Sequence, residues 1–217
     1  MAAKYLLHIA CISLSILTIN AVQTVNGKIK ITVGTTAGCG DTVTYIRDQL
    51  TPTYEKYKQF IELDFLPWGR TRRNADGTWF CQFSAHNCWA NRVHRCVLSK
   101  LPNQDAQLSY MSCEFTSPFP SWSQGSYRCA HDAGLSLVDI DHCVANPGDE
   151  IDIEAERRGT EIIDITDFVP STVFNDNTDK QLNDDAFTEL ESIVYTYSKR
   201  FCLRRSNVTL ASLHVVL

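Results

Sequence analysis

Nine cysteines among 217 residues constrain this chain more than any other feature of its sequence. Stable disulfides form in secretory environments, whereas the cysteine clusters of cytosolic proteins more often bind metal, so the role of these cysteines depends on the compartment. The N-terminus indicates the secretory pathway, because Lys4 precedes an apolar run over 5–22 and small and polar residues follow it. Cleavage after Ala21 or Gly27 would remove Cys11 and leave eight cysteines.

An uncleaved anchor is the alternative interpretation of this run, because its length is close to that of a membrane span. His8 and Asn20 within it favour cleavage, and on either interpretation the rest of the chain lies in the lumen. No later stretch is apolar enough to span a bilayer, so no membrane contact is expected after signal cleavage. Asn207, in the single Asn-Val-Thr acceptor, is the expected glycosylation site.

The charge balance excludes one class of partner. Acidic residues number 25 and basic residues 20, which gives a net charge of -5 and leaves no broad basic face for a phosphate backbone. We therefore expect no nucleic-acid partner. A hydrophobic fraction of 44% is typical of a globular protein, and the length fits one domain with an elaboration.

The first part of the chain predicts a strand–helix–strand unit. Apolar residues alternate over 28–35 and 61–67, which predicts two strands. Between them, 41–60 has apolar residues at spacings of three and four, which predicts a helix interrupted by Pro52. Such a unit is a right-handed βαβ crossover, and the loop with Cys39 lies at the carboxyl end of its first strand, where α/β sheets place their chemistry.

The middle of the chain has short helical fragments, many aromatic residues and six cysteines, and predicts a disulfide-rich helical insert at about 71–164. We interpret its acidic end, 145–167, as a solvated face. Regular structure resumes with a strand over 168–174, a turn, a short strand, and an amphipathic helix over 184–201 that covers the sheet. The expected organisation is a signal peptide 1–27, an α/β domain 28–203 with core segments 28–70 and 165–203, and a tail 204–217.

Cys39 is the candidate for reactive chemistry. It lies between a predicted strand and the first turn of a helix, where free backbone N–H groups and the helix dipole stabilise a thiolate. The Thr42 hydroxyl can donate a hydrogen bond to this sulfur, whereas Asp41 adds negative charge nearby. The structural alternative is a disulfide between Cys39 and Cys202.

We expect the cysteines of the insert to form disulfides. Gaps of six and seven residues lack the short spacing of structural zinc sites, so no metal or other cofactor is expected. The histidines that could join such a site, interpreted as lone surface residues, are His86, His94, His131 and His142. Six cysteines allow fifteen pairings, among which the sequence does not choose. The disulfide candidates are Cys81, Cys88, Cys96, Cys113, Cys129, Cys143 and, as a partner for Cys39, Cys202.

Residues 81–96 resemble the signature C-Q-H-G-x-x-E-C-x-x-N-x-x-x-x-C of the gamma-interferon-inducible lysosomal thiol reductase (GILT) family. The matching residues are Cys81, Gln82, Cys88, Asn91 and Cys96. The departures are Phe83 for His, Ser84 for Gly and Asn87 for Glu. The resemblance extends over roughly 29–202 and identifies the chain as similar to this family.

The resemblance implies a thioredoxin-like α/β fold with a disulfide-rich helical insert, in which a C-x-x-C at the first helix reduces protein disulfides in endosomes and lysosomes. Here Thr42 replaces the second cysteine, which in a dithiol enzyme resolves the mixed disulfide. A single-thiol mechanism through Cys39 is therefore expected, resolved by Cys202 or by a small-molecule thiol. Val169 and Pro170 match the residues that, in this fold, hold an extended substrate beside the catalytic cysteine, with the proline bond cis.

Thr42 also motivates a hypothesis from a different class. A redox-inactive or trapping relative would bind cysteine-bearing clients without turnover. The two hypotheses differ in an observable way, because a single-thiol enzyme cycles when a small thiol is supplied, whereas a trap accumulates a covalent adduct that only strong reductant releases.

Overall fold

The computed structural model describes residues 27–213, without the side chains of 163–165 and 200–213. Residues 1–26 of the expected signal peptide lie outside the described residues, as do the side chains of Cys202 and Asn207. Within 27–213, no helix combines the length and apolar character that a membrane span needs.

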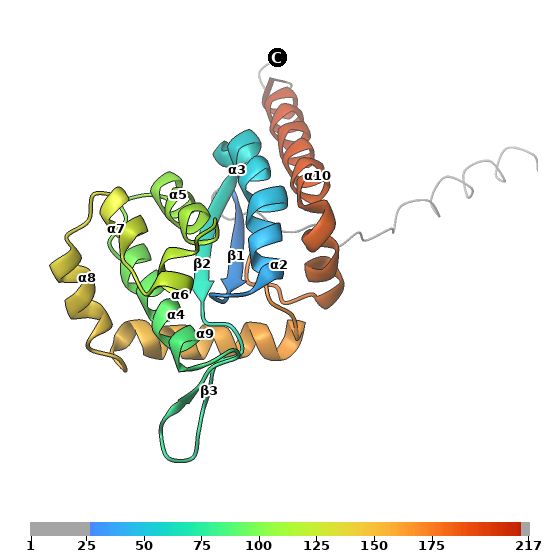
Figure 1. Cartoon of the computed structure of the whole chain (residues 1–217). Coiled ribbons are helices and arrows are strands. Elements are labelled where there is room, and N and C mark those ends of the chain that lie inside the picture. Colours follow the sequence, from blue (N-terminus) through green and yellow to red (C-terminus); the bar gives the residue numbers. More distant parts are fainter. Residues whose placement is uncertain (1–26, 214–217) are drawn as a thin grey trace, which may run out of the picture.

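A three-stranded sheet in the order β2–β1–β5 forms the centre of the fold (Figure 1). β1 (Ile29–Thr35) runs parallel to β2 (Ile61–Pro67) and antiparallel to β5 (Ser171–Phe174). In this register Ile31 lies beside Leu63, and the alternating apolar residues of both strands are buried on one face. The alternation in the sequence therefore predicted both strands correctly, to within one residue.

One continuous helical segment connects β1 to β2. It consists of α2 (Gly40–Tyr45), the π-helical turn η1 (Ile46–Leu50), α3 (Thr51–Tyr57) and the 3₁₀ turn η2 (Lys58–Phe60). Proline cannot donate a hydrogen bond to the carbonyl of the preceding turn. The interruption expected at Pro52 takes the form of the wider π turn just before it.

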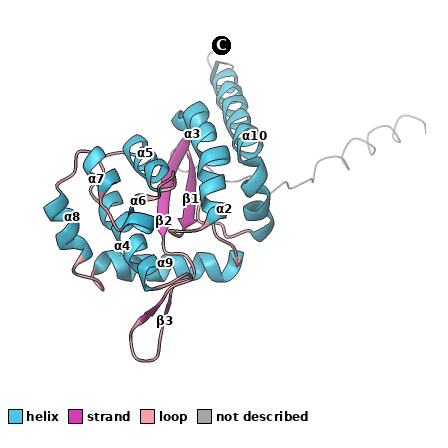
Figure 2. Ribbon diagram, in the orientation of Figure 1, coloured by secondary structure: helices cyan, strands magenta, loops and turns pink. Residues whose placement is uncertain are grey.

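Up to residue 144, the insert contains a small hairpin and five helices, gathered on one side of the sheet with the hairpin projecting (Figures 1 and 2). Its elements up to residue 144 are β3 (Arg72–Arg73), β4 (Trp79–Phe80), α4 (Ala85–Leu98), α5 (Gln104–Glu114), α6 (Pro120–Gln124), α7 (Arg128–Asp132) and α8 (Leu137–Val144). α9 (Glu150–Thr166) follows and leads back to the sheet.

Helices cover both faces of the sheet. α10 (Lys180–Leu213), which departs from helical geometry at Glu189, packs with α2 and α3 over the face that carries Ile31 and Phe174. α9 covers the other face, where Ala155 and Ile162 pack against Leu66 and Val173.

The short strand predicted after β5 is wrong, because only one bridge forms there, between Phe174 and Asn177. Asn175 and Asp176 adopt left-handed conformations with φ of 51° and 60°, which turns the chain directly toward α10. Asn183 of α10 then accepts a hydrogen bond from Thr172 N at 2.6 Å. A further strand beside β5 would have paired with this N–H group instead.

Three disulfides cross-link the insert. Cys81–Cys88 joins the end of the hairpin to α4, Cys96–Cys143 joins α4 to α8, and Cys113–Cys129 joins α5 to α7. The structure thus selects one of the fifteen pairings that the sequence left open.

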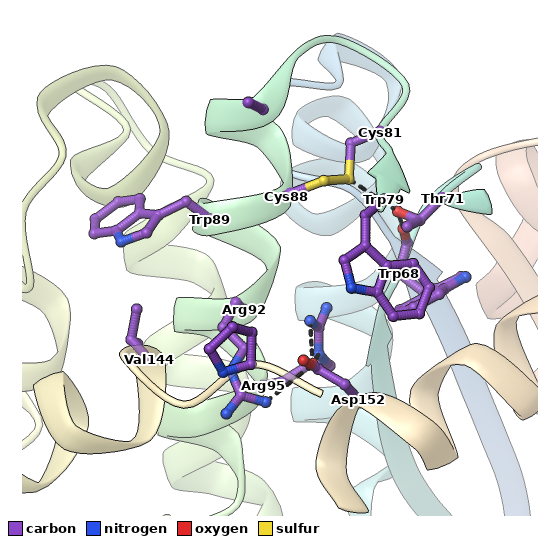
Figure 3. A pocket seen from close by; sticks show the side chains of 12 residues that line it. Trp68, Thr71, Trp79, Cys81, Cys88, Trp89, Arg92, Arg95, Val144 and Asp152 are labelled. Carbon is purple, nitrogen blue, oxygen red and sulfur yellow. Dashed lines mark hydrogen bonds and ion pairs between the residues drawn. A yellow bond between two sulfur atoms is a disulfide. The ribbon is translucent and has the colours of Figure 1, made fainter. Parts of the chain in front are cut away.

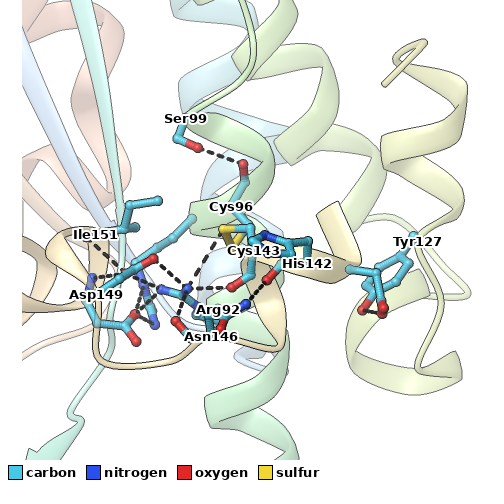
Figure 4. The surroundings of a disulfide bond; sticks show 12 residues. Arg92, Cys96, Ser99, Tyr127, His142, Cys143, Asn146, Asp149 and Ile151 are labelled. Carbon is cyan, nitrogen blue, oxygen red and sulfur yellow. Dashed lines mark hydrogen bonds and ion pairs between the residues drawn. A yellow bond between two sulfur atoms is a disulfide. The ribbon is translucent and has the colours of Figure 1, made fainter. Parts of the chain in front are cut away.

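An ion cluster around two buried arginines adds to these cross-links (Figures 3 and 4). Arg92 binds Asp149 at 2.7 Å and the carbonyl oxygens of Cys143 and Asn146, and Arg95 binds Asp152 at 2.6 Å. The expected solvated face at 145–167 is therefore wrong at Asp152, whose side chain is 3% exposed. Burial raises the pKa of Asp152, but Arg95 and Arg92 outweigh this effect and hold the pKa below its ordinary value.

Candidate functional site

Cys39 lies at the N-cap of α2, directly after the loop that leaves β1. Its side chain is 7% exposed, and its Sγ lies 3.6 Å from the carbonyl oxygen of Val169. The Val169–Pro170 bond is cis, as the resemblance predicts. Among the cysteines whose side chains are described, Cys39 alone forms no disulfide, and the side chain of its expected alternative partner Cys202 is not described.

The N-terminus of α2 has no side-chain cap. The partial positive charge of this helix end, which arises from its unpaired N–H groups, is therefore left beside Cys39. Asp41 in the first turn is exposed to solvent, which screens its negative charge. The sequence predicted this placement because a glycine-rich loop between an apolar strand and a helix leaves little choice of position for Cys39.

The hydrogen bond expected from Thr42 to Cys39 is not made in the structure. Thr42 is fully buried, and its Oγ1 has no hydrogen-bond partner. The reason is geometric: Cys39 has extended backbone angles (φ -83°, ψ 118°) and its sulfur meets Val169, whereas Thr42 shares the buried side of α2 with Tyr45.

Two asparagines of α4 bind the loop that leads to Cys39. Asn91 accepts a hydrogen bond from Ala37 N at 2.8 Å, and Asn87 donates one to Ala37 O at 2.6 Å. Both amides also donate to Thr36 Oγ1 at 3.0 Å, and all these groups are buried. The signature region of the insert therefore fixes the backbone two residues before Cys39.

Sequence reasoning missed this role of Asn87 and Asn91. Asn91 matched the family signature and Asn87 departed from it, but neither observation indicated what the side chains bind. A signal was present in their spacing, since residues four apart lie on the same face of a helix. That face could not be assigned to the Cys39 loop without the tertiary structure.

His94 is the clearest error among the histidines, because it is buried rather than on the surface. Its Nε2 lies 2.8 Å from Ser121 Oγ and 3.6 Å from Glu114, and Glu114 accepts a hydrogen bond from Ser121 N at 3.0 Å. Burial raises the pKa of Glu114, but His94 and Ser121 outweigh it and leave the pKa below its ordinary value. The buried group is inaccessible to substrate and links α6 to α4 and α5.

A cavity of about 250 Å³ lies beside α4 (Figure 3). Trp89 lies on one side and Trp68 and Trp79 on the other, with the Cys81–Cys88 disulfide at one end. None of the predicted site residues Cys39, Thr42, Val169 and Pro170 is among the lining residues. Within the described part of the chain, no group of three or more His, Cys, Asp or Glu side chains is arranged to hold a metal ion.

The site and the fold together define a class. A parallel βα unit with an unpaired cysteine at the helix start, facing a cis-proline before an antiparallel strand, is a thioredoxin-like arrangement, here with a disulfide-rich helical insert. The family model for "Gamma interferon inducible lysosomal thiol reductase (GILT)" matches residues 30–133. Over these residues the chain is similar to this family.

Curated relatives come from insects. The chain is 22% identical to "GILT-like protein 1" of Drosophila melanogaster over 208 residues, which is 86% of this chain and 83% of that protein. It is 28% identical over 114 residues to the "Gamma-interferon-inducible lysosomal thiol reductase-like protein" of Anopheles gambiae, which covers 46% of this chain and 47% of that one.

Two solved structures similar to this chain are oxidoreductases by title. A thioredoxin-like oxidoreductase from Silicibacter pomeroyi DSS-3 gives a TM-score of 0.49 at 11% identity, over 76% of this chain and 88% of that one. The oxidoreductase NmDsbA1 from N. meningitidis gives a TM-score of 0.45 at 13% identity, over 82% and 89% of the two chains.

Proposed function

We propose that this protein is a lumenal thiol–disulfide oxidoreductase of the GILT type that reduces protein disulfides through Cys39 acting as a single thiol. The observation that carries the proposal is the unpaired Cys39 at the start of α2, with its sulfur 3.6 Å from Val169 O and beside Pro170. The thiolate is the attacking species in disulfide exchange.

The proposed reaction has two stages. The Cys39 thiolate attacks one sulfur of a substrate disulfide, the substrate S–S bond breaks, and the departing substrate thiolate takes a proton. A small-molecule thiol then attacks the mixed disulfide at the Cys39 sulfur and releases the second substrate thiol, and another molecule of it regenerates the Cys39 thiolate. In total two small thiols supply two electrons and leave as one small-molecule disulfide.

Thr42 explains why an external thiol enters the proposal. It occupies the position of the resolving cysteine in a C-x-x-C, and a hydroxyl cannot resolve a mixed disulfide. Cys202 is the alternative resolving thiol within the chain. In either case we propose that Thr42 takes no part in the reaction and fills the position of the resolving cysteine as a buried residue.

Val169 and Pro170 are the proposed substrate-binding residues. Both are buried, and the Val169 carbonyl oxygen already accepts a contact from the Cys39 sulfur. Because Cys39 itself is 7% exposed, the substrate would approach as an extended segment whose backbone runs along Val169–Pro170. The partners are therefore disulfide-bonded proteins with locally extended cystines, in the secretory or endosomal and lysosomal lumen.

The first experiment asks whether Cys39 is free. Mass spectrometry of the mature protein, alkylated before reduction, should find Cys39 modified and the six insert cysteines paired as in the structure. A stable Cys39–Cys202 disulfide would overturn the proposal, because Cys39 would then have a structural role.

The second experiment measures turnover of a protein disulfide with and without a small thiol. Wild type should form a mixed disulfide without the thiol and cycle when it is present, and Cys39→Ser should do neither. Thr42→Cys should release reduced substrate without added thiol, because it supplies the resolving group. Full reductase activity in Cys39→Ser would overturn the proposal, and an adduct that small thiols leave intact would identify the protein as a trap.

A further inference from the structure

Five rings form a row along the surface of the insert. Phe83 contacts Trp122 at 6.2 Å between ring centroids, Trp122 contacts His86 at 5.7 Å, and His86 stacks on Trp89 at 5.2 Å. Trp89 in turn stacks on Tyr127 at 5.8 Å. We call these residues the aromatic row. None of the five side chains is fully buried, and Phe83 at one end is 45% exposed.

The row reaches the candidate site through Trp122. A Cβ placed on Gly38, the residue before Cys39, would lie 2.5 to 2.9 Å from three carbon atoms of the Trp122 ring. Real Cβ atoms do not approach so closely, so the ring packs directly on the glycine backbone. Trp122 thus lies on the insert side, directly against the residue that precedes Cys39.

Hydrogen bonds of the neighbouring residue fix the position of Trp122. The preceding residue, Ser121, donates its N–H to Glu114 at 3.0 Å and has its hydroxyl 2.8 Å from His94 Nε2. Its carbonyl oxygen lies 3.2 Å from Nε2 of His86, another member of the row. A ring fixed in this way loses little freedom when a ligand packs on it, which favours binding.

We propose that the end of the aromatic row formed by Trp122 and Phe83 is a subsite for an aromatic side chain that flanks the cystine attacked by Cys39. The inference rests on the proposed function and specifies its substrate class. The attacked cystine must reach the Cys39 sulfur. An extended chain advances at most about 3.6 Å per residue, so the substrate residues one and two positions from the cystine lie within about 7 Å of it. Trp122 touches the residue adjacent to Cys39 and therefore meets those neighbours.

The exposed aromatic rings of the row favour an aromatic side chain of the substrate. Aromatic pairs prefer tilted or offset contacts, and the existing Phe83–Trp122 pair, tilted by 56°, leaves ring surface exposed to accept another ring. A substrate with phenylalanine beside its cysteine should therefore react about threefold to tenfold faster than one with serine there.

Two disulfide-linked peptides of equal length and charge, with Phe or Ser next to the cysteine, test this subsite. The measurement is the second-order rate constant for mixed-disulfide formation with Cys39, followed by mass spectrometry. Hydroxyethyl disulfide, which has no flanking side chain, reports the basal reaction. Phe83→Ser should lose most of the preference for the Phe peptide and keep the rate with hydroxyethyl disulfide.

The chain supplies a matched control. Phe80 is 57% exposed and lies three residues before Phe83, and among the described residues no ring contact joins it to the row. Phe80→Ser removes the same surface chemistry and should leave the preference unchanged. Equal losses in the two variants would overturn the subsite, because general surface hydrophobicity would then explain the preference.

The remaining outcomes separate this inference from the proposed function. Equal rates of the two peptides with wild type, while hydroxyethyl disulfide reacts at Cys39, would overturn the subsite and leave the function standing. Absence of reaction with all three disulfides would overturn the function and the subsite with it. A dimer in sedimentation velocity that Phe83→Ser dissociates would show that a second copy covers the row, and would also overturn the subsite.

Discussion

In the sheet, β1 and β2 bury a continuous apolar face against α2, α3 and α10, and the cysteine described there, Cys39, is unpaired. In the insert, three disulfides and an ion cluster link short helices whose hydrophobic contacts are divided among many small elements. Two of the disulfides attach α7 and α8, which have five and eight residues, to the longer helices α5 and α4. Such short helices bury little apolar surface individually and gain most from cross-links.

The free thiol and the disulfides thus lie in different parts of the molecule. The sheet needs no disulfide of its own, so a free sulfur at the end of β1 lies in a part of the molecule that apolar burial already stabilises. The insert, with its cysteines paired, provides the rigid groups that position the thiol, namely Asn87, Asn91 and Trp122.

Removing a disulfide from the insert should have the largest effect on stability. Replacing Cys96 and Cys143 by alanine opens a loop with a sequence separation of 47, and chain entropy predicts a loss of about 4 kcal/mol in the free energy of unfolding. The pair Cys113 and Cys129, with a separation of 16, should lose about 3 kcal/mol. Urea denaturation measures both. A loss below about 1 kcal/mol for the longer loop would show that packing alone stabilises the insert.

Asp152→Asn should be the next largest change. It leaves the buried guanidinium of Arg95 without its carboxylate, and the expected loss in the free energy of unfolding is about 3 kcal/mol. Glu154→Gln, two residues further along α9, is the matched control, because its ion pair with Arg157 is exposed and its loss should leave the free energy of unfolding nearly unchanged. Similar losses in the two variants would mean that the ion cluster is not a structural element of the insert.

Asn91→Ala should disturb the contact between the two regions. It removes the acceptor of the buried Ala37 N–H, which should lower the free energy of unfolding by about 2 kcal/mol. The loosened loop should also expose Cys39 and increase its rate of alkylation by iodoacetamide. Asn146→Ala, whose exposed side chain bonds only within its own turn, serves as the control. An unchanged alkylation rate in Asn91→Ala would show that the loop keeps its position without α4.

Acid should weaken the insert through Asp152. Burial raises its pKa, but Arg95 and Arg92 more than compensate, so the folded-state pKa lies below the ordinary value. The stability that it contributes is complete above the unfolded pKa of about 4 and is lost as the pH falls through the lower folded pKa. Urea midpoints at pH 5 and pH 3 should therefore converge between wild type and Asp152→Asn. A constant difference between the two proteins across this range would contradict the assignment.

The sequence predicted the sheet side of the molecule well, because its signals are local. Alternation defined β1 and β2, and the glycine-rich loop located Cys39. The identity of the cis bond at Pro170 came from the resemblance, since an X-Pro bond carries no local signal for its isomer. The strand expected after β5 failed because a side chain from α10 takes its place, which is a tertiary event.

The insert was less predictable because contacts between distant segments determine its structure. Disulfide pairing, the burial of Asp152 and His94, and the binding of Ala37 by Asn87 and Asn91 all join segments far apart in the sequence. Composition shows that such residues exist, but only the packing of the helices shows which of them meet. An acidic run with one buried member looks the same in sequence as a run that is wholly solvated.

A substitution at Thr42 should have the smallest effect on stability. Thr42→Val replaces a fully buried hydroxyl that has no hydrogen-bond partner, so the free energy of unfolding should stay the same or rise by up to about 1 kcal/mol. Thr36→Val is the matched control, because the Thr36 hydroxyl is equally buried but bonded to Asn87 and Asn91, and it should lose about 2 kcal/mol. If Thr42→Val loses as much as Thr36→Val, the Thr42 hydroxyl has a partner in solution. The Cys39 sulfur, three residues earlier in the same helical turn, would then be the group to examine.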